Sequence, residues 1–319
     1  MPARFARGLP TVFASITEIE QKLAGAGYIA DHALATTVYL AGKLNKPLFL
    51  EGEPGVGKTA LAKAIAQLLG ADLIRLQCYE GLDAPAALYE WNYLRQMLEI
   101  RLQEARGVNK AELGRNIFGM EFLLQRPLLQ AIQHDSPVPP VLLVDEIDRS
   151  DEEFEAFLLE ILSDFQITIP EIGTIKAVQV PFVVLTSNRT REMHDALKRR
   201  CLYHWIEYPS LEKELMIVSA AVPGIAQQLS TQICVFMELL RQQEYYKRPG
   251  VAETIDWARA LLALGIQELE PDVVTSTLSC ILKYKSDQEK LSGATLQQTV
   301  ARAKGFKGRA PVPGQRTAP

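Results

Sequence analysis

A glycine-rich segment at residues 52–59 carries the residues best suited to chemistry. It reads GEPGVGKT and fits the pattern G-x-x-x-x-G-K-[ST] in full. Its glycines let the backbone curl so that several amide N–H groups converge on one anion, which a Cβ would obstruct. The helix expected to start near Lys58 adds the positive end of its dipole. We therefore predict a phosphate-binding loop, in which Lys58 reaches the β- and γ-phosphates of a nucleotide and the Thr59 hydroxyl holds Mg²⁺.

Two adjacent carboxylates follow a run of four aliphatic residues, 141–144. Such a run without alternation is typical of a strand buried on both faces of a parallel sheet. Asp145 ends this strand, where we expect it to complete the Mg²⁺ shell through water. Glu146 comes next, and we expect it to polarise the attacking water as a general base.

Polar residues after two later segments could complete the site. Asn188 follows the predicted buried strand 183–185. If that strand neighbours the strand of Asp145, the Asn188 amide lies between the water and the γ-phosphate and senses whether the phosphate is present. Arg199 and Arg200 end a short helix and form either a solvated cationic face or an arginine finger that acts on the neighbouring subunit. Arg200 is the first choice for the finger and Arg199 the second, and action on a neighbour requires a ring.

These motifs define one set of site residues with ATP and Mg²⁺ as cofactors. The nucleotide-binding residues are Gly52, Glu53, Pro54, Gly55, Val56, Gly57, Lys58, Thr59, Ala60 and Asp145. Thr59 and Asp145 are also the Mg²⁺ residues, through the nucleotide. Catalysis is assigned to Glu146, Asn188, Arg200 and Arg199.

The elements that must position these residues alternate between strand and helix up to Pro209 and are helical afterwards. We expect an α/β domain over 1–209, with a helical N-terminal segment and a parallel sheet flanked by helices. A smaller helical lid domain follows over 210–293, with Ser210 as a helix cap, and a largely disordered tail over 294–319. Ser150 and Glu153 predict a capping box before an apolar helical stripe. Residues 167–180 predict a β-hairpin.

Composition sets broad limits on the class of protein. The 319 residues include 48% hydrophobic and 23% charged residues, which is typical of globular proteins. The net charge of −4 argues weakly against an extended nucleic-acid track. We find neither an apolar run long enough for a membrane span nor a secretory signal. The four cysteines form no CxxC pair, so we expect buried thiols in a cytoplasmic protein.

Together these motifs, over roughly residues 20–290, resemble the AAA+ ATPases and specifically the MoxR family. The segments that carry the resemblance are GEPGVGKT, VLLVDEIDR, the hairpin before TSN, and Ala196-Leu197 with Arg199-Arg200-Cys201. The resemblance implies a hexameric, chaperone-like ATPase whose hairpin is the helix-2 insert and points into the pore. The nearest group within the family is that of the carbon-monoxide dehydrogenase accessory ATPases. That group implies a von Willebrand factor A domain partner and a client metalloenzyme whose active site is matured.

One segment departs from this family pattern. MoxR proteins usually carry a sensor-2 arginine at the start of a lid helix, but residues 249–253 read PGVAE here. Lys247, Arg248 or Arg259 could substitute for it.

Two other functions remain open. A nucleic-acid motor or loader shares the Arg-Cys segment, although the acidic total and the lack of a basic helix with interleaved aromatics weigh against it. An ATP-gated scaffold with little turnover is disfavoured because a pure binder has no use for Glu146.

Overall fold

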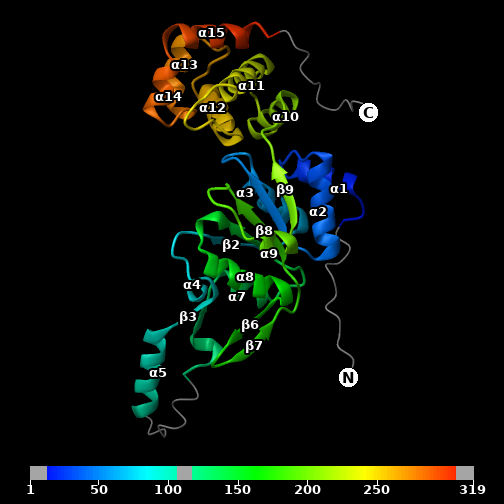
Figure 1. Ribbon diagram of the computed structural model, residues 1–319, viewed down its shortest axis with the longest axis vertical. Coiled ribbons are helices and arrows are strands. Elements are labelled where there is room, and N and C mark those ends of the chain that lie inside the picture. Colours follow the sequence, from blue (N-terminus) through cyan, green and yellow to red (C-terminus); the bar gives the residue numbers. More distant parts are fainter. Residues whose placement is uncertain (1–12, 106–116, 307–319) are drawn as a thin grey trace. The chain divides into compact units, whose positions relative to one another are not determined.

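The structure is a computed structural model that describes residues 13–105 and 117–306. The chain forms two compact units (Figure 1). The first comprises Met1–Lys22, Asp31–Glu51 and Thr59–Trp205, and the second comprises Leu23–Ala30, Gly52–Lys58 and Ile206–Pro319. None of the helices within the described ranges combines the length and apolar character needed to cross a bilayer.

A five-stranded parallel sheet forms the centre of the first unit, in the order β2-β5-β8-β1-β9. The strands are β1 Leu48–Gly52, β2 Leu73–Gln77, β5 Val141–Asp145, β8 Phe182–Ser187 and β9 Leu202–Ile206. Every residue of β1, β5 and β8 is buried, and the aliphatic run 141–144 of β5 therefore lies in a strand covered on both faces, as predicted. Strands β5 and β8 pair in parallel, so the strands that carry Asp145 and precede Asn188 are neighbours.

Helices flank this sheet and supply its core. They are α1 Ile16–Gly25, α2 His32–Leu44, α3 Lys58–Leu69, α4 Ala84–Leu88, α7 Pro127–Ile132, α8 Glu152–Asp164 and α9 Asp195–Arg200. Leu128 of α7 and Phe154 and Leu158 of α8 belong to the same buried cluster as Leu142 and Leu185 of the sheet. The α/β fold with helical flanks is therefore confirmed.

The N-terminus of α8 differs from the predicted capping box. Asp151, not Ser150, is the N-cap, and its carboxylate accepts a hydrogen bond from the Phe154 amide at 2.8 Å. The Ser150 hydroxyl instead donates to the Ile147 carbonyl at 2.8 Å and closes the short 3₁₀ turn η2, Ile147–Arg149. The capping box was wrong because two consecutive residues could both cap, and the preceding turn occupies the first.

The predicted hairpin is present but shorter than expected. Strands β6 Gln166–Ile169 and β7 Gly173–Lys176 pair in antiparallel orientation between α8 and β8. The hairpin therefore lies between a helix and a strand of the sheet and interrupts no helix. Its assignment as the helix-2 insert is wrong. A different insertion lies between α4 and α7, after β2. It comprises β3 Tyr89–Trp91, α5 Tyr93–Ala105, η1 Met120–Phe122 and β4 Leu123–Gln125.

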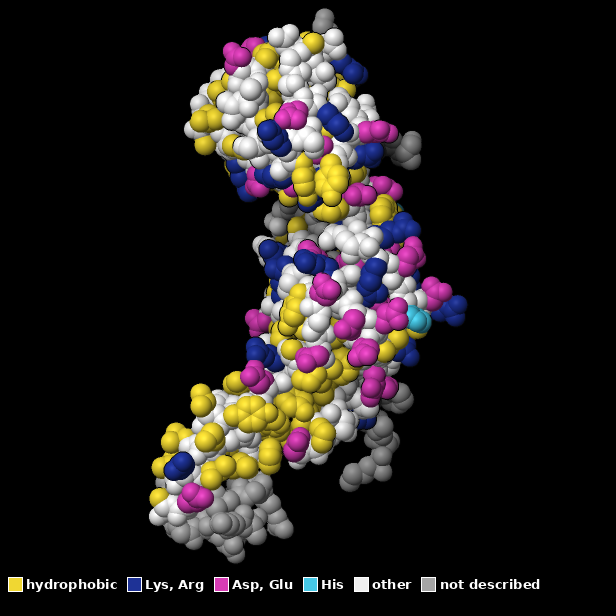
Figure 2. All heavy atoms as spheres, turned by 60° about the vertical axis from the view of Figure 1, so that its left-hand side comes forward, with side chains coloured by type: hydrophobic (Ala, Val, Ile, Leu, Met, Phe, Trp, Pro, Cys, Tyr) yellow, Lys and Arg dark blue, Asp and Glu magenta, His cyan; other side chains and the backbone are white. Residues whose placement is uncertain are grey.

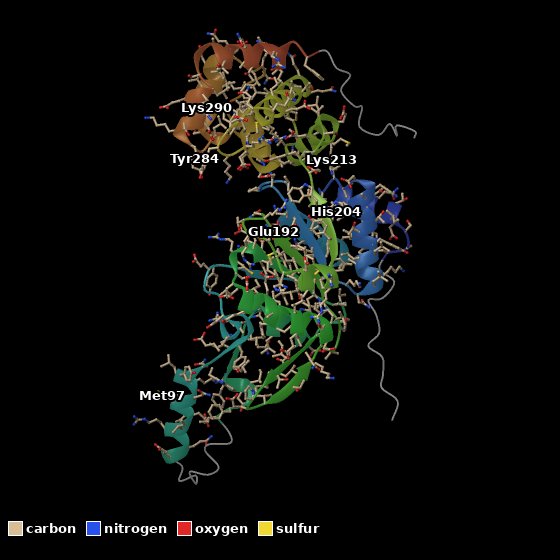
Figure 3. All side chains as sticks on the ribbon, in the orientation of Figure 1. Met97, Glu192, His204, Lys213, Tyr284 and Lys290 are labelled. Carbon is tan, nitrogen blue, oxygen red and sulfur yellow. The ribbon has the colours of Figure 1, made fainter. Side chains whose placement is uncertain are left out.

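Helix α5 of this insertion exposes its apolar side chains. Its exposed apolar residues are Tyr93, Leu94, Met97, Leu98 and Leu102. Gln96 on the opposite side is buried, and its side-chain amide donates to the Ile117 carbonyl at 2.7 Å. Figure 2 shows the resulting apolar surface, and Figure 3 labels Met97 within it.

The second unit is helical after β9. Its helices are α10 Leu211–Ala221, α11 Gln227–Arg241, α12 Val251–Ala263, α13 Pro271–Thr277, η3 Leu278–Cys280, α14 Lys285–Lys290 and α15 Gly293–Lys304. Ser210 caps α10, as predicted, by accepting from the Lys213 amide at 3.3 Å. The disordered tail predicted from 294 is wrong as far as α15 extends, since Leu296, Val300 and Ala303 are buried at helical spacing. The rest of that prediction, over 307–319, falls outside the described residues.

Candidate functional site

The glycine-rich loop of the second unit has the curled backbone that its sequence predicts. Gly52, Gly55 and Gly57 all have positive φ angles, of 154°, 81° and 102°. A Cβ at Gly52 would lie 2.4 Å from the Ile206 carbonyl oxygen, so no other residue fits there without a shift. Lys58 is 6% exposed, and its Nζ donates to the carbonyls of Gly52 at 2.7 Å and Glu53 at 2.8 Å. The loop thus holds an ammonium group against its own backbone at the start of α3.

The start of α12 contacts the same loop. The amides of Val251 and Ala252 donate to the Gly55 carbonyl at 3.0 and 3.2 Å. A Cβ on Gly55 would lie 3.1 Å from the Gly250 Cα, so both glycines permit this close approach. Glu253 caps the helix by accepting from the Gly250 amide at 2.9 Å. A carboxylate therefore lies at the segment where the family resemblance implies an arginine.

One candidate for a replacement arginine is engaged elsewhere in the second unit. Arg259 donates to the Ala221 carbonyl at 3.4 Å and pairs with Asp256 at 3.7 Å. Substitution for the sensor-2 arginine by Lys247 or Arg248 stays a prediction.

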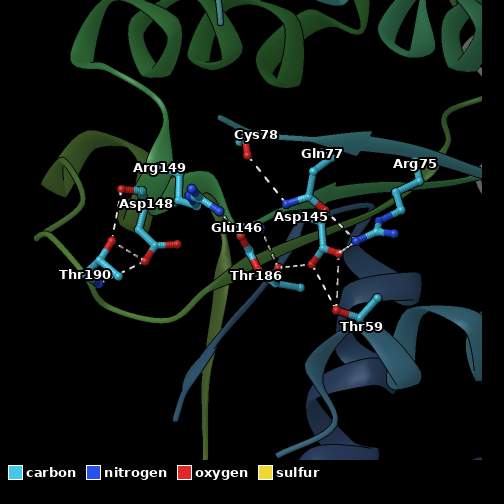
Figure 4. Close-up of polar contacts among 10 residues, drawn as sticks. All are labelled: Thr59, Arg75, Gln77, Cys78, Asp145, Glu146, Asp148, Arg149, Thr186 and Thr190. Carbon is cyan, nitrogen blue, oxygen red and sulfur yellow. Dashed lines mark hydrogen bonds and ion pairs between the residues drawn. The ribbon is translucent and has the colours of Figure 1, made fainter. Parts of the chain in front are cut away.

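Asp145 is the centre of a polar cluster at the carboxyl edge of the sheet (Figure 4). It is 2% exposed, and both of its oxygens accept hydrogen bonds. The Thr59 hydroxyl, at the start of α3, lies 3.0 Å from Oδ1 and 3.3 Å from Oδ2. The Thr186 hydroxyl of β8 lies 2.5 Å from Oδ1, and Arg75 Nη2 of β2 lies 2.5 Å from Oδ2. Three elements of the first unit thus hold one carboxylate.

Glu146 turns away from the strand in the left-handed region, with φ 56° and ψ 50°. This conformation is costly for a residue with a side chain, and it persists where neighbours hold it. The Thr186 hydroxyl does so here by accepting from the Glu146 amide at 2.9 Å. The Glu146 carboxylate is one-third exposed and pairs with Arg149 at 3.2 Å. One threonine therefore fixes both acidic residues.

The loop that contains Asn188 is tied to the turn after β5. Asn188 is half-buried and follows β8 directly. Two residues further on, the Thr190 amide and hydroxyl donate to Asp148 Oδ2 at 2.9 and 2.7 Å. Asp148 is 3% exposed. These bonds hold the loop of Asn188 against the segment of Asp145 and Glu146.

The two candidate finger arginines lie at the end of α9 and are both exposed. Arg200 Nη1 donates to the Leu159 carbonyl of α8 at 2.6 Å. Within the described part of the chain, no hydrogen bond or ion pair joins Arg199 or Arg200 to the Asp145 cluster. Their role stays a prediction.

Sequence reasoning missed Thr186, Asp148, Thr190 and Arg75. The first three could have been noticed as polar residues within or beside buried strand ends, where such groups need partners. Arg75 gave no signal, because its contact depends on β2 lying beside β5.

Cys78 follows β2 and lies behind the acidic cluster, and its amide donates to the Asp145 carbonyl at 2.8 Å. Burial, together with the nearby negative charges of Asp145, Asp148 and Glu146, raises the pKa of its thiol to about 12. The thiol therefore stays protonated at neutral pH and is no nucleophile.

The cluster is chemically suited to Mg²⁺. The ion prefers hard oxygen ligands and keeps several waters, so that one hydroxyl and one carboxylate suffice beside nucleotide phosphates. Thr59 and Asp145 bring these two groups together, 3.0 Å apart.

A glycine-rich loop with a lysine at a helix start, and an acidic pair ending a buried parallel strand, define a P-loop nucleotide-binding protein. The profile of the ATPase family associated with various cellular activities (AAA) matches residues 48–207. This is half of the chain, and the chain therefore belongs to the AAA family of ATPases.

Two individual proteins that the chain resembles share less than a third of its residues over the aligned parts. The chain is 25% identical over 242 residues to the chaperone MoxR1 of Mycobacterium tuberculosis, covering 73% of this chain and 54% of the relative. It is 29% identical over 132 residues to the Lon protease of Porphyromonas gingivalis, covering 40% and 12%. The chain thus spans little more than half of one relative and a small part of the other.

Solved structures resemble the chain only loosely. A putative ATPase from Cytophaga hutchinsonii has a TM-score of 0.46 and 15% identity, covering 90% of this chain and 93% of that one. A mutant of Thermotoga maritima RuvB has a TM-score of 0.44 and 17% identity, covering 84% and 70%.

Proposed function

We propose that this AAA-family protein hydrolyses ATP with the residues of the loop 52–59 and of the Asp145 cluster. Loop amides and Lys58 bind the phosphates, and Thr59 and Asp145 hold Mg²⁺. The ion, when bound, neutralises charge on the β- and γ-phosphates. Glu146 accepts a proton from the attacking water, and Asn188 orients that water against the γ-phosphate. The observation that carries this proposal is the Thr59–Asp145–Thr186 cluster with Glu146 held beside it.

Replacing the proposed base tests this assignment. Glu146→Gln keeps the size and the backbone hydrogen bond but cannot accept the proton. We expect turnover to fall about 10²- to 10⁴-fold, while ATP binding stays within about twofold. Glu153→Gln, an exposed glutamate of α8, is the matched control. Unchanged turnover in Glu146→Gln would remove Glu146 from this role.

The proposal extends to a ring, hexameric by family resemblance, in which Arg200 or Arg199 stabilises the phosphoryl charge on the neighbouring subunit. The exposure of both side chains supports this, because a residue that serves a neighbour must be accessible. Arg200→Ala should be inactive alone and regain activity when mixed with Lys58→Ala subunits, whose arginine is intact. No recovery on mixing contradicts action between subunits.

We further propose that the ATP cycle remodels a client protein, as a member of the MoxR group. The similarity to a protein named chaperone MoxR1 supports this. The finer proposal is the maturation of a metalloenzyme in the cytoplasm together with a von Willebrand factor A domain partner, as in the carbon-monoxide dehydrogenase accessory group. Capture experiments with Glu146→Gln and ATP test it, because an arrested enzyme should retain its client. ATPase stimulation by DNA or RNA would instead favour a nucleic-acid motor.

A further inference from the structure

Arg75 of β2 makes a contact that the proposed reaction does not use. Its Nη2 lies 2.5 Å from Asp145 Oδ2 and 2.5 Å from Gln77 Oε1 (Figure 4). The contact follows from the parallel register, in which Arg75 pairs with Leu143 and Gln77 with Asp145. The arginine reaches along its own strand toward the carboxyl edge, and Gln77 holds the same nitrogen there.

The two partners of this ion pair have unequal surroundings. The Asp145 side chain is 3% exposed, whereas the Arg75 side chain is 48% exposed. Asp145 Oδ1 is the main acceptor for both threonine hydroxyls, at 2.5 and 3.0 Å. Oδ2 has Arg75 as its short contact and Thr59 only at 3.3 Å. The carboxylate is therefore fixed through one oxygen and neutralised through the other.

We propose that Arg75 is the resident counter-cation of the Mg²⁺ site, which neutralises Asp145 before the ion binds and gives way when it does. This inference rests on the proposed function, which assigns Asp145 to Mg²⁺. Both cations are attracted by the same buried charge, so they compete for it. Arg75 is suited to leave because its contact is single, not bidentate, and its side chain is half in solvent.

Such competition changes how strongly nucleotide binding depends on Mg²⁺. The apparent affinity for the ion is reduced by the fraction of molecules in which Arg75 leaves Asp145 accessible. Without Mg²⁺, the same arginine reduces repulsion between Asp145 and the nucleotide phosphates. Removing the charge should therefore strengthen binding with Mg²⁺ and weaken it without.

The test compares the dissociation constant of a fluorescent ATP analogue in EDTA with that at one fixed Mg²⁺ concentration below saturation of the site. For Arg75→Met we expect the ratio of the two constants to rise about threefold to tenfold over the original protein. Arg75→Lys keeps the charge and should stay within about twofold. The matched control is Arg126→Met, since Arg126 is also 48% exposed and lies 2.5 Å from the Glu90 carboxylate. This control should leave the ratio unchanged.

An unchanged or lower ratio in Arg75→Met overturns the counter-cation role. Arg75→Gln, which is also uncharged, takes its place if Arg75→Met does not fold. If the original protein binds the analogue equally well with and without Mg²⁺, the Mg²⁺ part of the proposed function has failed. If only the variants fail to differ, the proposed function stands and the role of Arg75 falls.

Discussion

The two units each contain an arginine that pairs with a buried carboxylate, but the pairs are built differently. In the helical unit, Arg241 binds Glu214 through two nitrogens at 2.6 and 2.8 Å, and both side chains are buried. Arg241 also donates to the Pro249 carbonyl and lies 5.0 Å from the Tyr208 ring. At the sheet edge, Arg75 binds Asp145 through one nitrogen and is half exposed.

This difference indicates that the Arg241–Glu214 pair is a structural contact, whereas the Arg75–Asp145 pair can open when a ligand binds. A bidentate, desolvated pair loses much when either partner is removed, because the other charge stays buried without compensation. A half-exposed partner can return to water at small cost. We therefore expect the helical pair to contribute to folding and the edge pair to respond to ligands.

The largest effect is expected from breaking the helical pair. Arg241→Met leaves Glu214 buried without its cation, and the free energy of unfolding should fall by about 3–5 kcal/mol. Urea denaturation measures this. Arg259→Met, at an exposed pair 3.7 Å from Asp256, should change it by less than about 0.5 kcal/mol. Equal effects of the two variants would show that the buried Arg241–Glu214 pair contributes no more to folding than an exposed pair does.

Stability at alkaline pH tests the burial of two thiols in the first unit. Burial raises the pKa of both Cys78 and Cys201 from 9.0 to about 12. Between these values the unfolded chain releases thiol protons that the folded chain keeps, so stability falls as pH rises. Each thiol contributes a slope of up to about 1.4 kcal/mol per pH unit. Replacing both by alanine should flatten the decline between about pH 9 and 11, and an unchanged slope would contradict the burial of these thiols.

Thr186 tests the acidic cluster itself. Thr186→Val keeps the shape of the side chain but removes the donor to Asp145 and the acceptor for the Glu146 amide. The free energy of unfolding should fall by about 1–3 kcal/mol because buried polar groups lose a partner. Turnover should fall as well, since both acidic residues lose their support. Thr186→Ser, which retains the hydroxyl, should keep most of the activity. Normal stability and turnover in Thr186→Val would show that the hydroxyl positions neither residue.

The smallest effect concerns the cap of α8. Asp151→Ala removes the acceptor for the Phe154 amide and should cost about 1 kcal/mol in thermal or urea unfolding. Asp151→Asn still caps and should cost only a few tenths of that. If Asp151→Ala proves neutral, the helix is capped by another residue.

Much of the site followed from local sequence. The loop 52–59, Asp145, Glu146 and the strand before Asn188 were predictable because glycine conformation, aliphatic runs and adjacent carboxylates act within a few residues. Arg75 was not predictable because its contact with Asp145 depends on the order of the strands in the sheet. Asp148 was not predictable because its partner Thr190 lies 42 residues further along the chain. The α8 cap was misplaced because two consecutive residues, Ser150 and Asp151, can both cap a helix. Helix α15 was not predicted because its buried face is defined by packing within the helical unit.

The central claim is that the loop 52–59 binds a triphosphate through Lys58. Calorimetric titration of ATP with Mg²⁺ tests it most directly on Lys58→Ala, with Lys63→Ala, an exposed lysine of α3, as the matched control. We predict that Lys58→Ala weakens ATP binding at least about tenfold, while Lys63→Ala binds normally. Equal ATP affinity in Lys58→Ala and the original protein would contradict the account.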